Sequence, residues 1–121
     1  MVPLTLDDIL DVCVNAQPSD EQLDAFCAHS GRTRASALDA IAQDVAHRYM
    51  IGSLTYNLGD AAMNHLFAYG SRRGMLPEIM ESVFLAFDEG EYVHSGDSPE
   101  ITPDTRTRPK IAEILAKLGA T

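Results

Sequence analysis

The chain has 121 residues and a formal net charge of −9, and its length suits a single domain, residues 1–121, with a core of its own. Because a phosphate backbone is met by a basic stripe, the acidic charge disfavours nucleic-acid binding. No stretch approaches the roughly 18 consecutive apolar residues of a membrane span, so the sequence predicts a soluble, cytoplasmic protein with no membrane partner.

Two capping patterns place the first two helices. Thr5 with Asp8 forms a capping pair, which predicts a helix over residues 6–15. Ser19 is followed three residues later by Gln22, which forms a capping box for a second helix. Because the turn between them is short, the two helices are expected to pack antiparallel.

The third and fourth predicted helices follow the same apolar periodicity. Thr33 is a suitable cap for a helix that begins at Arg34 and is the longest of the chain. The fourth helix begins at either Ser53 or Asp60 and ends at the glycines from Gly70 onward. The apolar side of the third helix is predicted to consist of Leu38, Ile41, Ala42, Val45 and Tyr49.

A fifth, strongly apolar helix leads into an acidic stretch. Pro77 suits its first turn, and it is predicted to end near Asp88. Residues 89–108 hold glycines, prolines and several acids and are predicted to form a long surface loop, after which Pro109 opens a short final helix. The inward face of the fifth helix is predicted to be Leu76, Ile79, Met80, Val83, Phe84 and Phe87.

No run of alternating residues is long enough to predict a strand. The predicted fold class is therefore all-α, a compact single-domain bundle of five to six helices with a long acidic loop before the last helix. The two cysteines, Cys13 and Cys27, fall on apolar faces and lack the spacing of a metal or redox site. They are interpreted as reduced core residues, and no cofactor is predicted.

Charge is unevenly distributed along the chain. Residues 1–31 hold six acids and no Lys or Arg, and residues 74–104 hold eight acids and again no base. Two such blocks are expected to attract a partner protein with a basic surface. The alternative is that the acidity only keeps a small protein soluble. The predicted partner-binding residues are Asp88, Glu89, Glu91, Tyr92, His94 and Asp97.

The acidic loop is also the candidate metal site, because carboxylates and an imidazole three residues apart can converge on a divalent cation. The spacing does not match an EF-hand loop, which has glycine at its sixth position; counting from Asp88, that position is Val93. A solvated acidic loop is therefore favoured over a metal site. The candidate metal ligands are Asp88, Glu91, His94 and Asp97.

A second group of polar residues, Asp60, Asn64 and His65, lies on the fourth predicted helix. A histidine in an apolar stripe is usually a hydrogen-bonded core residue, which is the favoured interpretation of His65. The alternative pairs His65 with Asp88 as a base and its orienting carboxylate. No nucleophile elbow or phosphate loop is present. The sequence therefore predicts no catalytic residues, and an enzyme is disfavoured.

These features predict a small acidic protein-interaction module. An immunity or antitoxin-type inhibitor is its most concrete form, since a compact acidic protein suits the covering of a basic active site. The alternative is a metal-binding domain or metal-dependent enzyme that uses the stretch from Asp88 to Asp97, with His65 as a further ligand.

Overall fold

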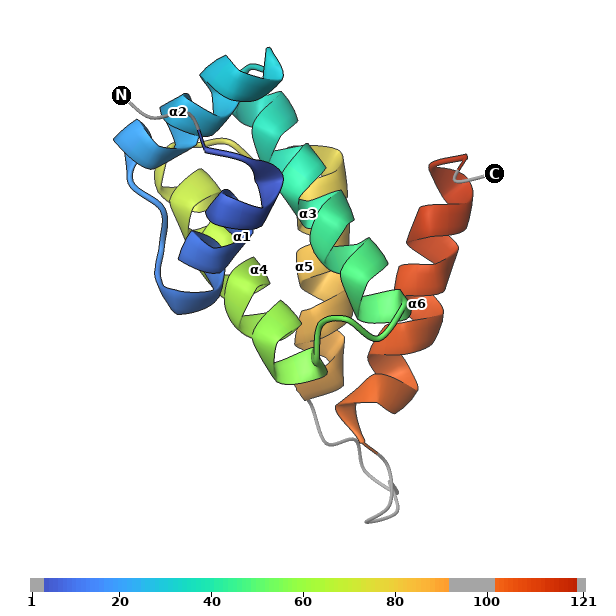
Figure 1. Ribbon diagram of the computed structural model, residues 1–121. Coiled ribbons are helices and arrows are strands. Elements are labelled where there is room, and N and C mark those ends of the chain that lie inside the picture. Colours follow the sequence, from blue (N-terminus) through green and yellow to red (C-terminus); the bar gives the residue numbers. More distant parts are fainter. Residues whose placement is uncertain (1–3, 92–101, 120–121) are drawn as a thin grey trace.

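Six α-helices account for most of residues 4–91 and 102–119, the ranges that the computed structural model describes (Figure 1). No strand occurs in these ranges, so the predicted all-α fold is confirmed. The helix α3 contacts each of the other five and forms the centre of the bundle. The helices are α1 (Leu6–Asn15), α2 (Asp20–Ser30), α3 (Arg34–Met50), α4 (Tyr56–Arg72), α5 (Glu78–Glu91) and α6 (Pro103–Lys117).

The first helices begin where their capping residues predicted. The Thr5 hydroxyl accepts from the Asp8 backbone N–H at 3.2 Å, and the Asp8 carboxylate accepts in return from the Thr5 backbone N–H at 3.0 Å. Ser19 and Gln22 form the equivalent pair at the start of α2. In each pair, the two side chains accept hydrogen bonds from backbone N–H groups that have no partner within the helix. Gly31 closes α2 with a φ of 69°, in the left-handed region that glycine tolerates.

The start of α4 corrects the prediction. The helix begins at Tyr56, and neither Ser53 nor Asp60 is its first residue. Thr55 is the cap, because its hydroxyl accepts from the Leu58 backbone N–H at 3.3 Å. The Ser53 hydroxyl instead donates to a backbone oxygen of the preceding turn at 3.3 Å.

Both predicted boundaries of the long loop before the last helix are wrong. The helix α5 continues past Asp88 to Glu91, and α6 begins at Pro103. Pro109 therefore lies inside α6 and does not open it. Pro109 lacks the N–H that would bond the carbonyl of Thr105, but both residues are exposed, so solvent can satisfy that carbonyl.

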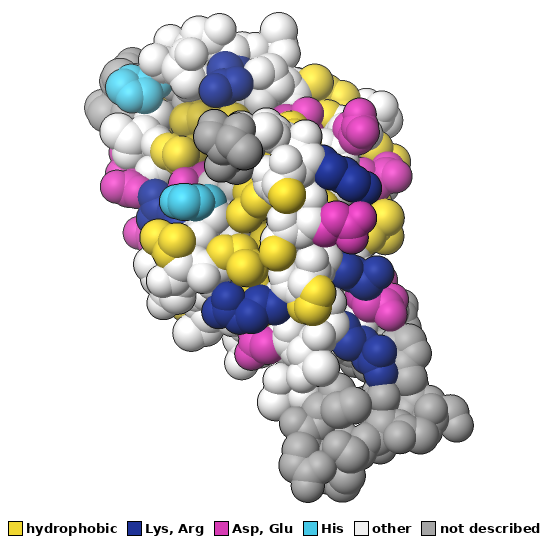
Figure 2. All heavy atoms as spheres, turned by 90° about the vertical axis from the view of Figure 1, so that its right-hand side faces the viewer, with side chains coloured by type: hydrophobic (Ala, Val, Ile, Leu, Met, Phe, Trp, Pro, Cys, Tyr) yellow, Lys and Arg dark blue, Asp and Glu magenta, His cyan; other side chains and the backbone are white. Residues whose placement is uncertain are grey.

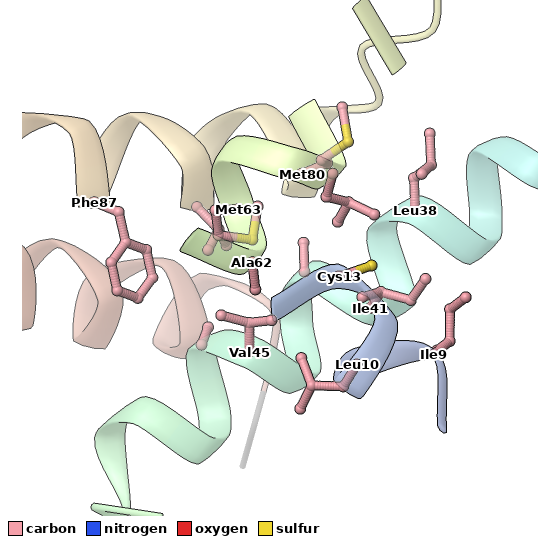
Figure 3. Packing of buried hydrophobic residues seen from close by; sticks show 14 of the residues in the cluster. Ile9, Leu10, Cys13, Leu38, Ile41, Val45, Ala62, Met63, Met80 and Phe87 are labelled. Carbon is pink, nitrogen blue, oxygen red and sulfur yellow. The ribbon is translucent and has the colours of Figure 1, made fainter. Parts of the chain in front are cut away.

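The hydrophobic core surrounds α3 and draws on every helix. Residues from α1, α3, α4 and α5 interdigitate at its centre (Figure 3). Cys13 is fully buried there, which confirms it as a core residue, and this burial raises the pKa of its thiol to about 12. The labelled residues in this close-up are Ile9, Leu10, Cys13, Leu38, Ile41, Val45, Ala62, Met63, Met80 and Phe87.

The inward face of α5 differs in part from the prediction. Phe87 is fully buried, and its ring meets that of Tyr49 edge-on with centroids 5.1 Å apart. Phe84 is only half-buried and stacks on Phe67 with centroids 3.9 Å apart. Leu76 is 44% exposed, so its predicted inward position is wrong. It precedes the first turn of α5, so the helical periodicity does not apply to it.

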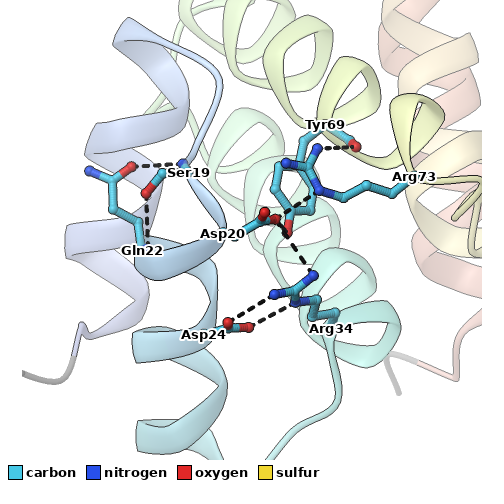
Figure 4. Close-up of polar contacts among 7 residues, drawn as sticks. All are labelled: Ser19, Asp20, Gln22, Asp24, Arg34, Tyr69 and Arg73. Atoms are coloured by element: carbon cyan, nitrogen blue, oxygen red, sulfur yellow. Dashed lines mark hydrogen bonds and ion pairs between the residues drawn. The ribbon is translucent and has the colours of Figure 1, made fainter.

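A polar network fastens α2 to α3 and α4 (Figure 4). The Tyr69 hydroxyl donates to Asp20 Oδ1 at 2.6 Å, and Arg73 Nε donates to the same oxygen at 2.8 Å. Arg34 bridges both oxygens of Asp24, at 2.8 and 2.9 Å. These hydrogen bonds hold the pKa values of Asp20 and Asp24 below their usual range. Two carboxylates of the first acidic block are thus neutralised within the fold.

Candidate partner-binding site

Acidic residues from two separate stretches of the sequence meet at one end of the bundle, where the last turn of α5 lies against the first turns of α4. Asp60 belongs to α4, whereas Asp88 and Glu91 belong to α5. The carboxyl groups of Glu91 and Asp88 lie near that of Asp60 and raise its pKa. These three residues are called the acidic cluster below.

Burial and like charges determine the protonation of Asp60. Loss of solvent, then the carboxyl group of Glu91 and then the charge of Asp88, raise the pKa of Asp60 from 3.8 to about 7. Asn64 opposes them, since its Nδ2 donates to Asp60 Oδ2 at 3.4 Å. No donor within the described residues reaches the other oxygen, Oδ1, which is shielded from solvent.

Tyr56 fixes the position of α4 against the end of α5. Its hydroxyl donates to the backbone oxygen of Phe87 at 2.6 Å. Burial, followed by the charges of Asp60 and Glu91, raises the pKa of Tyr56, so the hydroxyl remains a donor at neutral pH. Because this bond joins the first residue of α4 to the last turns of α5, it brings Asp60 and Glu91 together.

The start of α6 supports the same turn of α5 from the other side. A Cβ atom placed on Gly90 would lie 2.3 Å from Thr107 Oγ1 and 2.9 Å from the backbone oxygen of Pro103. The Thr107 hydroxyl donates to the backbone oxygen of Ala86 at 2.8 Å. The first turns of α6 therefore pack directly on the backbone of α5, which only glycine at position 90 permits.

Three of the six predicted partner-binding residues lie in α5, not in a loop. Asp88 and Glu89 are half-buried, and Glu91 is exposed. That Asp60 lies beside them was not predicted, because the sequence of the fourth helix does not indicate which helix packs against it. The remaining three predicted residues lie outside the described ranges: Tyr92, His94 and Asp97.

His65 is turned away from the acidic cluster. It is half-buried, and its Nδ1 lies 2.7 Å from the backbone oxygen of Cys13 in α1. Because a carbonyl oxygen only accepts, Nδ1 is the protonated nitrogen in this bond. The prediction of a hydrogen-bonded histidine is confirmed. The alternative pairing of His65 with Asp88 is not formed.

The candidate metal ligands do not make a binding site in the described part of the chain. Within residues 4–91 and 102–119, no three His, Cys, Asp or Glu side chains are arranged to hold a metal ion. The three carboxyl groups of the acidic cluster therefore do not converge on one point. Of the predicted ligands, Asp88 and Glu91 belong to this cluster, whereas His94 and Asp97 lie outside the described residues.

A groove between α5 and α6 begins beside the acidic cluster. It consists of two hollows of about 360 Å³ each, which share Ser82, Ile114 and Lys117. Figure 2, which looks onto the α6 side of the molecule, shows charged side chains of both signs alternating along one edge of this face. This groove was not predicted. Its signal was Leu85, an apolar residue outside the predicted inward stripe of α5.

Comparison with known proteins offers no relative. No family model, no curated protein and no solved structure matches this chain. In the part of the chain that the structure describes, no helix combines the length and apolar character needed to cross a membrane. The charge, burial and shape of the described surface are therefore what bear on function.

Proposed function

We propose that this protein is a small acidic interaction module that binds a basic partner protein through the acidic cluster and the adjacent Glu89. An immunity or antitoxin-type inhibitor is the most concrete form of this function. In that role, the acidic surface would cover a basic active site on the partner.

The observation that supports this proposal most strongly is the contrast between the two acidic regions. Asp20 and Asp24 are neutralised by arginines of the same chain. Asp60 instead has the carboxyl groups of Glu91 and Asp88 as its strongest electrostatic neighbours. Like charges held together in a half-buried place destabilise a fold. A cationic side chain from a partner would relieve this repulsion.

The net charge of −9 adds a long-range contribution. A strongly charged surface raises the rate of encounter with an oppositely charged partner, and the gain falls as salt screens the attraction. An inhibitor that must reach its target before damage occurs benefits from such fast association.

The test is affinity capture of partners from an extract of the native cell. We expect a basic protein whose binding weakens as salt is raised and falls about tenfold when Glu89 and Glu91 are both replaced by Gln. The matched control replaces Asp11 and Glu21, two exposed acids of α1 and α2, by Asn and Gln. It changes the net charge by the same amount and should reduce binding far less.

Two results would contradict the proposal. One is the absence of any captured protein whose binding depends on Glu89 and Glu91. The other is an equal loss of binding in the control variant, which would mean that only the overall charge matters.

A further inference from the structure

The groove between α5 and α6 begins beside a close contact between the two helices. At the end near the acidic cluster, Gly90 lets α6 approach the backbone of α5, and a Cβ there would clash with Thr107. Towards its C-terminal end, α6 diverges from α3 (Figure 1). In this region Ile79 of α5 and Ile114 of α6 line the hollow between the helices.

The groove combines apolar and acidic lining. Leu85 and Leu118 are 53% and 37% exposed, and each lines one of the two hollows. They are two of the five large hydrophobic side chains that are exposed within the described ranges. Single exposed leucines are common, but two that line one continuous groove with Ile79 and Ile114 form a surface suited to an apolar ligand.

Carboxylates mark both ends of the groove. Asp88 and Glu89 line the hollow nearer the acidic cluster, and Asp39 and Glu78 line the other. The groove also contains Lys110, Lys117 and Glu113, but Lys117 is paired with Glu113 at 3.1 Å. The residues that line the two hollows include five acids and two lysines, so their formal charge is negative. A ligand that fits it carries apolar side chains in its middle and basic side chains towards its ends.

We propose that this groove binds an amphipathic, basic helix of the partner protein. A helix that presents apolar residues at positions i, i+3 or i+4 and i+7 can place them on Leu85, Ile114 and Leu118, while flanking Lys or Arg side chains meet the carboxylates. Two antiparallel helices with a groove between them accept a third helix by the ordinary packing of ridges into grooves. This inference rests on the proposed function, because it names the part of the basic partner that is recognised.

The test uses the whole protein, labelled with ¹⁵N, and two synthetic peptides of identical composition. One peptide carries leucines at helical spacing flanked by lysines, and the other has the same residues in a scrambled order. We expect the amphipathic peptide to shift the amide signals of Ser82, Leu85 and Ile114 and to bind about tenfold more tightly than the scrambled one.

Two substitutions separate the groove from the rest of the surface. Leu85→Ser should weaken binding of the amphipathic peptide about tenfold, because it removes an apolar anchor from the groove. Leu58→Ser is the matched control: Leu58 is 45% exposed on α4 and lines neither hollow, so its loss should leave binding unchanged. Ser82→Phe, which fills the floor shared by both hollows, should block the peptide while leaving the core intact.

Equal binding of both peptides, or signal changes confined to α1 and α2, would overturn the groove inference. A dimer of the free protein that Leu85→Ser dissociates would also overturn it, in favour of a second copy as occupant. Neither result affects the capture experiment with Glu89 and Glu91, so the groove can fail while the basic partner remains. If the capture experiment fails as well, the proposed function fails with it.

Discussion

At the scale of single residues, Asp60 is the most informative side chain. It is on a helix surface by sequence, yet the fold buries it partly and places it beside Glu91 and Asp88. Its raised pKa is a consequence of tertiary structure. The pKa of Asp60 therefore indicates whether the end of α5 keeps its position beside α4.

The pH dependence of stability follows from this shift. The pKa of Asp60 rises from 3.8 to about 7 on folding, so the folded protein binds the proton more tightly than the unfolded chain. The resulting stabilisation is fully present below about pH 4 and is lost as the pH rises through about 7. Because the group is only partly buried, we expect only about 1 kcal/mol after solvent screening.

Asp60→Asn tests this expectation, since Asn cannot acquire the charge. Urea unfolding at pH 5 and pH 8 should show that the variant gains stability relative to the parent as the pH rises. Asp11→Asn, at an exposed position of α1, is the control and should show no such gain. Identical differences between Asp60→Asn and parent at both pH values would mean that the acidic cluster is not formed.

Replacement of Gly90 by Ala is predicted to destabilise the fold, although helix propensity alone favours alanine. In an open helical position, Gly→Ala is stabilising by roughly 1 kcal/mol. Here the new Cβ would meet Thr107 Oγ1 at 2.3 Å, so α6 must move away from α5. We expect Gly90→Ala to destabilise by about 1 to 3 kcal/mol in chemical denaturation. A stabilised variant would show that α6 separates from α5 without cost.

At the scale of whole elements, α5 depends on a cap that another helix supplies. Pro77 precedes its first residue and has no side-chain acceptor for the free N–H groups. Asp39 of α3 takes that role, because its Oδ1 accepts from the Met80 backbone N–H at 2.9 Å. A carboxylate there also interacts favourably with the positive end of the helix. The start of α5 is therefore fixed by α3.

Two substitutions of Asp39 separate the hydrogen bond from the charge. Asp39→Ala removes both and should lower the free energy of unfolding by about 1 to 2 kcal/mol. Asp39→Asn keeps an acceptor oxygen and should lose about half as much or less. Urea denaturation measures both changes. Equal effects of the two variants would show that charge, not the hydrogen bond, holds the start of α5.

The helices whose boundaries were predicted correctly are those with local signals. Thr5, Ser19 and Thr33 cap α1, α2 and α3 through backbone groups three residues away, so the sequence alone determines these starts. The end of α5 is held instead by contacts between distant residues, such as Thr107 with the Ala86 carbonyl, and no local pattern reveals such a contact. The start of α6 does carry a local signal, Pro103 in its first turn, but the prediction placed that turn at Pro109. The predicted loop was too long for these two reasons.

The same distinction applies to the candidate site. Asp88, Glu89 and Glu91 are neighbours in sequence and were predicted to share one surface. Asp60 joins them only because Tyr56 bonds the Phe87 carbonyl across two helices. The prediction therefore identified the carboxylates of α5 but not the residue that most strongly perturbs the local electrostatics.

At the scale of the whole molecule, arginines pair with acidic residues of α1 and α2. Arg34 and Arg73 neutralise α2, and Arg48 pairs with Asp7 of α1. A surplus of nine negative charges remains over the chain as a whole. Each surface ion pair contributes only about 0 to 1 kcal/mol. The surplus repels itself over longer distances, and this repulsion opposes folding at low ionic strength.

Salt should therefore stabilise the protein at neutral pH. Sodium chloride shortens the screening length from about 30 Å at 0.01 M to about 8 Å at 0.15 M. Over this range, we expect the free energy of unfolding in urea to rise by on the order of 1 kcal/mol, because relief of repulsion exceeds the weakening of ion pairs. The control is the same titration near pH 4.6, the isoelectric point, where the net charge vanishes and salt should have little effect or a slightly destabilising one. A loss of stability with salt at neutral pH would show that the pairs of Arg34, Arg48 and Arg73 outweigh the acidic surplus. In that case the carboxylates at the end of α5 would impose no strain for a basic partner to relieve.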